Sequence, residues 1–442
     1  MIRIHCGTFE AETYWRETDL AALPSIPDQA GASIVDAMDE LLFLFCSPGD
    51  LLLTKKPLDD AFADYLRSLG FQFGCNRFNL RTKTQDQSGP RAMNMFEALA
   101  WESFPPELPD FLAGGQRFEP FAIIQGLEEA TSRYGLTGRF PSDAVVRAVN
   151  AKGYSVRMRE RLGIDNPAVL VHSVEQLKLE SEKLLRQGPF LIKDDYGVSG
   201  KGNLLVDSSR TLARISDYLE LQRRTGKRIR FVLEPQLPRE IDFSCQFRIG
   251  EAGQFELLSV QRLSNDGFAF GGSHTADADL MNRLETSGYF QLVKTIGRNL
   301  YEDDYFGDVC IDSMTLRSGE IVPLVEINAR KSMSLIKYYA DRYLKRAGMN
   351  GCLIPMTLVH DGSVGFAELL ERFDAAGLLY RGDGREGIMP LSAGTLYRDT
   401  MEGRPFKGRW YVAVASDRPE RHSELADKAT KLLKEAGLER KG

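Results

Sequence analysis

The strongest constraint on the fold is a glycine-rich loop between two apolar segments, GPFLIKDDYGVSGKGNLLVD, at residues 188–207. It is not a P-loop, because Asp195 stands where that motif needs its first glycine and Gly202 where it needs Ser or Thr. It is not a dinucleotide-binding turn either, because the glycine spacing is reversed. The apolar continuation predicts a second strand. We therefore expect a hairpin whose bare backbone N–H groups can approach an anion.

Composition restricts the class of protein. A chain of 442 residues is too long for one ordinary core and predicts two or three domains. A net charge of −6 argues against nucleic acid or a membrane surface as partner. The six cysteines are scattered without a C-x-x-C pair, which favours reduced thiols over disulfides or zinc. The charged N-terminus and the absence of a long apolar run predict a cytoplasmic protein.

Apolar periodicity alternates between strand and helix along the chain and predicts an α/β (α+β) fold class. Residues 1–140 should form a small α/β domain with a parallel sheet, and a helical pattern follows Ser142, a candidate cap. The segments expected are strands at 40–50, 71–74, 168–172, 230–234, 242–249 and 257–263, helices at 58–69, 174–187, 210–224 and 279–300, a loop at 268–276, a hairpin at 308–330 and a final strand–helix unit.

The sequence EINAR, at residues 326–330, alternates as a strand does. Glu326, Asn328 and Arg330 should therefore share one face, opposite Ile327 and Ala329. Carboxylate and amide oxygens suit Mg²⁺, which takes one or two carboxylates with phosphate and water, and an arginine can neutralise an oxyanion. An exposed strand face with an ordinary ion pair explains these residues equally well.

Asp312, on the preceding strand, favours the metal hypothesis. If the intervening turn has an odd number of loop residues, Asp312 lies on the same face as Glu326 and opposite it. Two carboxylates so close repel each other unless a cation lies between them. A register that paired Asp312 with Val325 would contradict this interpretation.

A proline-bracketed segment follows the strand that ends at Glu234. Pro235 and Pro238 lack an N–H, so the amides of Gln236 and Leu237 are the expected free donors to the edge of a flat base. Glu240 could then accept hydrogen bonds from ribose hydroxyls. A plain connecting loop with solvated acids is the competing interpretation.

These pieces, in this order, resemble the ATP-grasp superfamily. The resemblance covers residues 141–360 and rests on NAKGYSVRMRERLGI, PFLIKDDYGVSGKGNLLVD, VLEPQLPREIDFS and CIDS with LVEINAR. It implies two α+β subdomains that clasp ATP. The flanking regions, through DELLFLFCSPGD and RFPSDAVVRAVNAK, resemble peptide ligases of natural-product pathways of the pheganomycin type. The implied division is a Rossmann-like pre-ATP-grasp domain at 1–140, an ATP-grasp domain at 141–365 with its hinge near 231–241, and a small C-terminal domain at 366–442.

The resemblance assigns roles residue by residue. Those implied are ATP-phosphate contacts for Lys152 and Lys193, a mobile loop of Ser199, Gly200, Lys201 and Gly202, an adenine hinge of Glu234, Gln236 and Leu237, ribose binding for Glu240, Mg²⁺ ligation by Asp312, Glu326 and Asn328, and stabilisation of the acyl phosphate by Arg330 with Lys201. Two Mg²⁺ ions are expected, with Mn²⁺ as a substitute. Asp194 and Asp195 depart from the commoner family pattern and should point outward or towards a basic substrate group.

The implied activity is carboxylate activation. A carboxylate, from an amino acid or peptide, attacks the γ-phosphate, and an amine then takes the acyl group to give an amide, ADP and phosphate. A thiol acceptor on a carrier protein or coenzyme A, a kinase on the same fold, and a nucleotide-binding regulator without turnover are the alternatives. His274, Ser332 and Ser334 are candidate substrate contacts, and the sequence leaves a homo-oligomer open.

Overall fold

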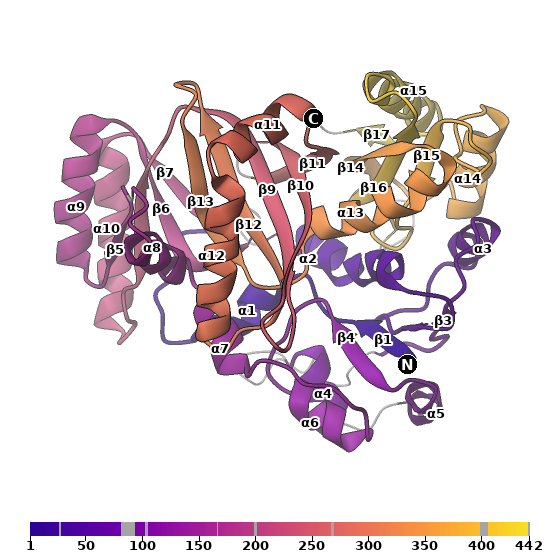
Figure 1. The fold of residues 1–442 in the computed structure, drawn as a ribbon, viewed down its shortest axis with the longest axis horizontal. Coiled ribbons are helices and arrows are strands. Elements are labelled where there is room, and N and C mark those ends of the chain that lie inside the picture. Colours follow the sequence, from indigo (N-terminus) through magenta and orange to yellow (C-terminus); the bar gives the residue numbers. More distant parts are fainter. Residues whose placement is uncertain are drawn as a thin grey trace.

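The computed structural model describes residues 1–25, 28–80, 93–101, 105–165, 167–198, 201–266, 269–397 and 405–440. The strands within these ranges form three sheets, which belong to an N-terminal domain, a small lobe and a large lobe (Figure 1). In this view the small lobe lies at the left of the large lobe, and the N-terminal domain lies below. None of the described helices is long and apolar enough to cross a lipid bilayer.

The N-terminal domain is an α/β unit. Its elements are β1 (Arg3–Cys6), α1 (Ala11–Trp15), α2 (Gln29–Asp36), η1 (Met38–Phe45), β2 (Leu51–Leu52), α3 (Asp60–Ser68), β3 (Gly74–Cys75), α4 (Met95–Trp101), α5 (Glu107–Ala113), β4 (Arg117–Pro120) and α6 (Leu127–Arg133). The four strands are all parallel, as the sequence predicts. Their order in the sheet is β3-β2-β1-β4. The strand predicted at 40–50 is wrong: η1 is a 3-10 helix buried along its whole length. A short apolar run enclosed by core has no period that separates strand from helix.

The small lobe is an antiparallel sheet with helices on its outer side. Its elements are α7 (Asp143–Val149), α8 (Lys152–Arg161), β5 (Val169–Val171), α9 (Val174–Gln187), β6 (Phe190–Val198), β7 (Lys201–Val206), α10 (Ser209–Arg224) and β8 (Phe231–Pro235). The order is β5-β8-β6-β7, so the glycine-rich stretch is the predicted hairpin. Ser142 caps α7 by accepting from the Val145 N–H, at 3.3 Å. The helical pattern breaks at Asn150, whose amide bonds to the backbone of Ala329 instead.

The large lobe carries the longest sheet. Its elements are β9 (Arg239–Ile249), β10 (Phe255–Asp266), β11 (Ala269–Thr275), α11 (Ala278–Thr286), α12 (Tyr289–Glu302), β12 (Gly307–Leu316), β13 (Ile321–Asn328), α13 (Met333–Leu344), η2 (Lys345–Ala347) and β14 (Asn350–His360). The loop expected at 268–276 is wrong, because β11 pairs with both β10 and β14. A Cβ on Gly272 would lie 2.9 Å from the Leu353 carbonyl oxygen, so this glycine serves close strand approach rather than a loop. The single helix expected at 279–300 is divided at Gly288.

The C-terminal residues extend the same sheet. Their elements are α14 (Phe366–Ala375), β15 (Gly387–Pro390), β16 (Phe406–Ser416), α15 (Arg421–Glu435) and β17 (Glu439–Arg440). The strand order is β13-β12-β9-β10-β11-β14-β16-β15, with β17 beside β14. The expected strand–helix unit is therefore present as β16 and α15, and it continues the sheet of the large lobe.

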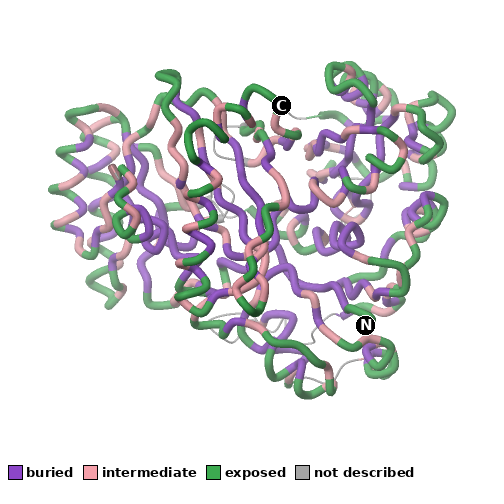
Figure 2. The backbone as a smooth tube through the Cα atoms, in the orientation of Figure 1, coloured by how far each residue is buried: buried purple, intermediate pink, exposed green. Residues whose placement is uncertain are grey.

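Burial separates the small lobe from the rest of the molecule. Many strand residues of the three sheets are buried, and the outer faces of the helices are exposed (Figure 2). The small lobe has its own apolar cluster, to which Ala21 and Leu23 of the N-terminal domain contribute. The segment after α1 is thus packed into the small lobe, and the Ala21 N–H donates to the Arg228 carbonyl, at 2.8 Å.

Candidate active site

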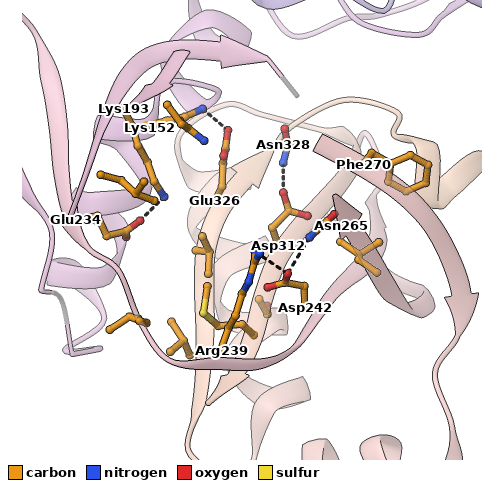
Figure 3. Close-up of a pocket in the computed structure, with 18 of the residues that line it drawn as sticks. Lys152, Lys193, Glu234, Arg239, Asp242, Asn265, Phe270, Asp312, Glu326 and Asn328 are labelled. Carbon is orange, nitrogen blue, oxygen red and sulfur yellow. Dashed lines mark hydrogen bonds and ion pairs between the residues drawn. The ribbon is translucent and has the colours of Figure 1, made fainter. Parts of the chain in front are cut away.

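A cavity of about 840 Å³ lies between the small lobe and the large lobe. Strands β6 to β8 form one wall, and β9, β12, β13 and the start of α13 form the other (Figure 3). Most of the residues singled out from the sequence line this cavity: Lys152, Lys193, Glu234, Gln236, Leu237, Asp312, Glu326, Asn328, Arg330, Ser332 and Ser334.

The β12–β13 hairpin sets the carboxylates opposite each other. The Leu316 N–H bonds to the Glu320 carbonyl, at 2.8 Å, and encloses a three-residue loop, the odd number that the sequence predicts. That loop alone would set Leu324 opposite Asp312. A register shift next to Pro323, which has no N–H for the ladder, moves Glu326 into that place, so Asp312 pairs with Glu326. Ile327 and Ala329 are buried on the other face, as predicted.

Charge on this wall is only partly balanced. Burial raises the pKa of Asp312 to about 7, and the facing Glu326 carboxylate adds to that rise. The Asn328 side chain donates to Asp312, with 3.0 Å between Nδ2 and Oδ2. Arg330 donates to Asn328 from Nη2, over 3.1 Å.

The donor set of this wall fits Mg²⁺. Two carboxylates and an amide oxygen are hard oxygen ligands, and Mg²⁺ bound with substrate phosphates needs no more from a protein. Among the described residues, no cluster of three or more His, Cys, Asp or Glu side chains could hold a metal by itself. A cation bound here would take its remaining ligands from a substrate or from water.

The two lysines reach the cavity from α8 and β6 of the small lobe. Lys152 Nζ lies 2.7 Å from Glu326 Oε1 and also donates to the Gly197 carbonyl, at 3.0 Å (Figure 3). Although burial acts to lower it, Glu326 raises the pKa of Lys152 above its ordinary value. Lys193, on β6, pairs with the buried Glu234 carboxylate. Both lysines are thus charged groups held at the cavity by carboxylates.

The glycine hairpin has one position that only glycine can fill. Gly202 has a φ of +106°, and a Cβ there would lie 2.9 Å from the Gly197 Cα. Lys201 begins β7 and pairs through its backbone with Val198. Ser199 and Gly200 lie outside the described residues, so their predicted contacts with ATP remain predictions.

The expectation for the two acids after Lys193 is wrong. Asp194 is buried against Arg16 of the N-terminal domain, with 3.1 Å between Oδ2 and Nη2. Asp195 is buried between Arg230, at 2.8 Å, and the Gly153 N–H, at 2.8 Å. Arginines from distant segments neutralise both acids, so neither points outward.

The hinge differs from its prediction in one respect. The Gln236 N–H is not free, because it donates to the Pro189 carbonyl at 3.0 Å. The Leu237 N–H donates to no other described residue and remains the available donor. The Glu234 side chain is held in ion pairs, since Arg159 also contacts it, at 3.1 Å. Arg159 escaped the sequence analysis, although it lies two helical turns from Lys152 and hence on the same face.

Glu240 does not line the cavity, so the structure does not support its predicted ribose role. It accepts from Thr315 Oγ1, at 3.1 Å, beside a register shift of β9 against β12. Asp242 lines the cavity instead (Figure 3). Its Oδ2 accepts from Arg239 at 3.0 Å and from Asn265 at 2.8 Å.

The candidate substrate residues divide into two groups. Ser332 caps α13 by accepting from the Leu335 N–H, at 3.1 Å, and Ser334 accepts from Ser244 Oγ, at 2.8 Å. Both serines lie at the cavity. His274 does not line it and lies 3.4 Å from Cys352 Sγ, so its predicted contact with substrate is not supported.

Comparison with known proteins identifies the fold. No family model matches the chain. A curated relative, [butirosin acyl-carrier protein]–L-glutamate ligase of Niallia circulans, is 24% identical over 313 residues, which cover 70% of this chain and 67% of that protein. The fold superimposes on the ADP complex of PurK, N5-carboxyaminoimidazole ribonucleotide synthetase, with a TM-score of 0.55, 12% identity and coverage of 98% and 96%. It also superimposes on the L-amino acid ligase of Bacillus licheniformis, with a TM-score of 0.51, 11% identity and coverage of 100% and 98%.

The chain has the ATP-grasp fold. The fold class expected from the sequence is confirmed, and the proteins that the chain resembles are ligases and synthetases, in agreement with the expected enzyme class. In this fold the cavity lies between the small lobe and the large lobe.

Proposed function

We propose that the enzyme activates the carboxylate of an amino acid or peptide with ATP and joins it to an amine. The products are an amide, ADP and phosphate. The observation that supports this most directly is the pair Asp312 and Glu326, which face each other across two strands at a cavity that Lys152 and Lys193 also line. Carboxylates for a cation and lysines for phosphate in one cavity are what phosphoryl transfer requires.

The distribution of side chains suggests how ATP lies. Leu191, Leu205 and Leu237 give the hinge end of the cavity an apolar surface suited to a base, and the Leu237 N–H is a donor at its edge. Asp242 is the acidic residue best located to accept from the ribose. The phosphates then lie at the opposite end, with the lysines.

Asp312, Glu326 and Asn328 are the residues that would hold Mg²⁺, and we expect two ions, with Mn²⁺ as a substitute. The metal would neutralise charge that develops on the transferred phosphoryl group.

Side chains of the protein stabilise the remaining charges in the reaction. Lys152 and Lys193 screen the phosphates as the substrate carboxylate attacks the γ-phosphorus, and the bond to the β,γ-bridging oxygen breaks to release ADP. Arg330 stabilises the acyl phosphate and the oxyanion formed when the amine attacks it. Burial raises the pKa of Cys310, which lines the cavity, to about 12, so its thiol is protonated and is no nucleophile.

A carrier-protein thiol is the second candidate acceptor, favoured by one observation. The curated relative is, by its name, a ligase of L-glutamate and an acyl-carrier protein. In that case the acyl phosphate would give a thioester rather than an amide, with the same residues in the same roles.

The test is ADP release with amino acids alone, with paired amino acids, and with an amino acid plus a phosphopantetheinylated carrier protein. ADP that needs an acid and an amine together supports amide formation, and ADP that needs the carrier supports the thioester. ADP formation that is independent of any carboxylate would contradict both and favour a kinase, which transfers phosphate to another acceptor, or an ATP hydrolase, which transfers it to water. Mass spectrometry of the products identifies the acid and the acceptor.

A further inference from the structure

The helix α1 brings a buried carboxylate from the N-terminal domain to the active site. Glu12 is only 5% exposed, and one of its oxygens, Oε1, accepts from Arg330 Nε at 2.8 Å and from Arg330 Nη2. The two residues are 318 positions apart in the chain. Arg330 lines the cavity, so Glu12 contacts the active site through it.

The contact continues to the carboxylate pair. Nη2 of Arg330 also donates to Asn328 Oδ1, at 3.1 Å, and Asn328 Nδ2 donates to Asp312 Oδ2, at 3.0 Å. Glu12 is therefore the first group of a hydrogen-bonded line that ends on a predicted metal ligand. A charge-assisted bond to a planar guanidinium fixes its direction as well as its location.

Several contacts hold α1 in place. Trp15 Nε1 donates to the Ile123 carbonyl, at 2.9 Å, and ties the helix to its own domain. Arg16, which follows the helix, pairs with Asp194 of the small lobe at 3.1 Å. The Arg330 guanidinium lies over the Phe121 ring, 5.9 Å from its centroid. Glu12 is thus supported by packing on both sides of the cavity and is not a mobile surface acid.

Glu12 also keeps the positive charge of Arg330 apart from the site proposed for a cation. Without it, the Arg330 guanidinium would be drawn towards the carboxylates of Asp312 and Glu326, with which it interacts electrostatically. Arg330 would then neutralise the groups that should face a cation and a phosphate. A counter-ion on Arg330 opposes this, and the desolvation cost of burying both charges is offset by their mutual attraction and hydrogen bonds.

We propose that Glu12 is a positioning residue that holds the Arg330 guanidinium at the wall of the cavity, in the orientation in which it meets the acyl phosphate. This inference rests on the proposed function. It makes the N-terminal domain a part of the catalytic machinery in addition to any role in substrate choice.

The test compares Glu12→Gln with Glu17→Gln. Glu17 is a matched control because it belongs to the same segment and pairs with Arg228 and Arg230, outside the cavity. Glu12→Gln should lower kcat by about 10- to 100-fold, the usual loss when a supporting partner of an active-site group is removed. The Kd for Mg·ADP, measured by calorimetry, should stay within about twofold, and Glu12→Asp should recover part of kcat. Glu17→Gln should keep the wild-type kcat.

The double variant Glu12→Gln/Arg330→Gln should be no slower than Arg330→Gln alone, because a positioning residue acts only through its partner. Full kcat in Glu12→Gln, losses that multiply in the double variant, or a loss of ADP affinity parallel to that of kcat would each overturn the proposal.

A failure of the proposed function gives a different result. If the wild-type chain releases no ADP with any carboxylate, the ligase assignment fails, and the melting temperatures of the same variants still decide whether Glu12 holds Arg330. A double variant that melts no lower than the worse single variant supports the contact, and fully additive shifts contradict it.

Discussion

The two walls of the cavity balance their charges in different ways. On the small-lobe wall, Glu234 is buried between Lys193 and Arg159, and these contacts hold the pKa of the carboxyl below its ordinary value although burial acts to raise it. On the large-lobe wall, Asp312 and Glu326 face each other and the pKa of Asp312 is raised to about 7. The carboxylate of the first wall is balanced by the protein's own cations, whereas the facing carboxylates of the second are only partly balanced, which is why we propose a cation there. Assembly and catalysis should therefore depend on different walls.

The largest effect is expected on the large-lobe wall. Asp312→Asn and Glu326→Gln should each lower kcat by on the order of 10³-fold or more, because each removes a ligand from a set that has only two carboxylates. The melting temperature of Asp312→Asn should not fall, since the repulsion between the carboxylates is also removed. In Glu326→Gln the loss of the ion pair with the buried Lys152 opposes that gain. Steady-state ADP release and thermal denaturation measure the two quantities. A variant with full activity would refute the metal assignment.

A substitution on the small-lobe wall should change the free energy of unfolding. Glu234→Gln leaves Lys193 and Arg159 without their buried counter-ion and should lower the free energy of unfolding by about 3–5 kcal/mol, measured by urea denaturation. Glu220→Gln, on the exposed face of α10 beside Arg223, is the control and should leave the free energy unchanged. If Glu234→Gln unfolds like the wild type, the two walls do not differ in the way described.

Near the hinge, two neighbouring acids, Asp242 and Glu240, offer a further comparison. Asp242→Asn should raise the KM for ATP by about 10-fold, because Asp242 lines the cavity and a charged acceptor is lost. Glu240→Gln should leave KM unchanged, because Glu240 bonds to Thr315 outside the cavity. The reverse outcome would restore the ribose role that the sequence assigns to Glu240.

A further prediction, on stability alone, concerns a carboxyl that does not line the cavity. Glu40 accepts from the Ala393 N–H, at 2.8 Å, and burial raises its pKa from 4.5 to about 8. Between those two values the folded state binds more protons than the unfolded state, so stability should fall as the pH rises from about 4.5 to about 8. Glu40→Gln should flatten this part of the profile, measured as urea denaturation against pH. An unchanged slope would show that Glu40 is ionised in the folded protein.

What the sequence could predict was local. Alternation predicts the faces of Glu326, Asn328 and Arg330, and an odd loop predicts the face of Asp312, so the arrangement of these side chains at one wall could be predicted without a structure. The direct pairing also needed the shift at Pro323, which no spacing rule supplies.

The remaining features depend on contacts between distant segments. From the first domain, Glu12 contacts Arg330 at the cavity wall and Arg16 contacts Asp194 of the small lobe. The Gln236 N–H is bonded to Pro189, a residue in another part of the sequence. No periodicity encodes such contacts. The strand predicted at 40–50 failed for a different reason, because a segment buried on all sides has no polar face to reveal its period.

The most direct test of the account is transfer of oxygen from the carboxylate substrate. Once an active acid is found, that acid is supplied with ¹⁸O in its carboxylate, and the released phosphate is analysed by mass spectrometry. If the carboxylate attacks the γ-phosphorus and an acceptor then displaces phosphate, one ¹⁸O atom per turnover appears in the phosphate. Phosphate without ¹⁸O, or AMP in place of ADP, would contradict the acyl-phosphate mechanism.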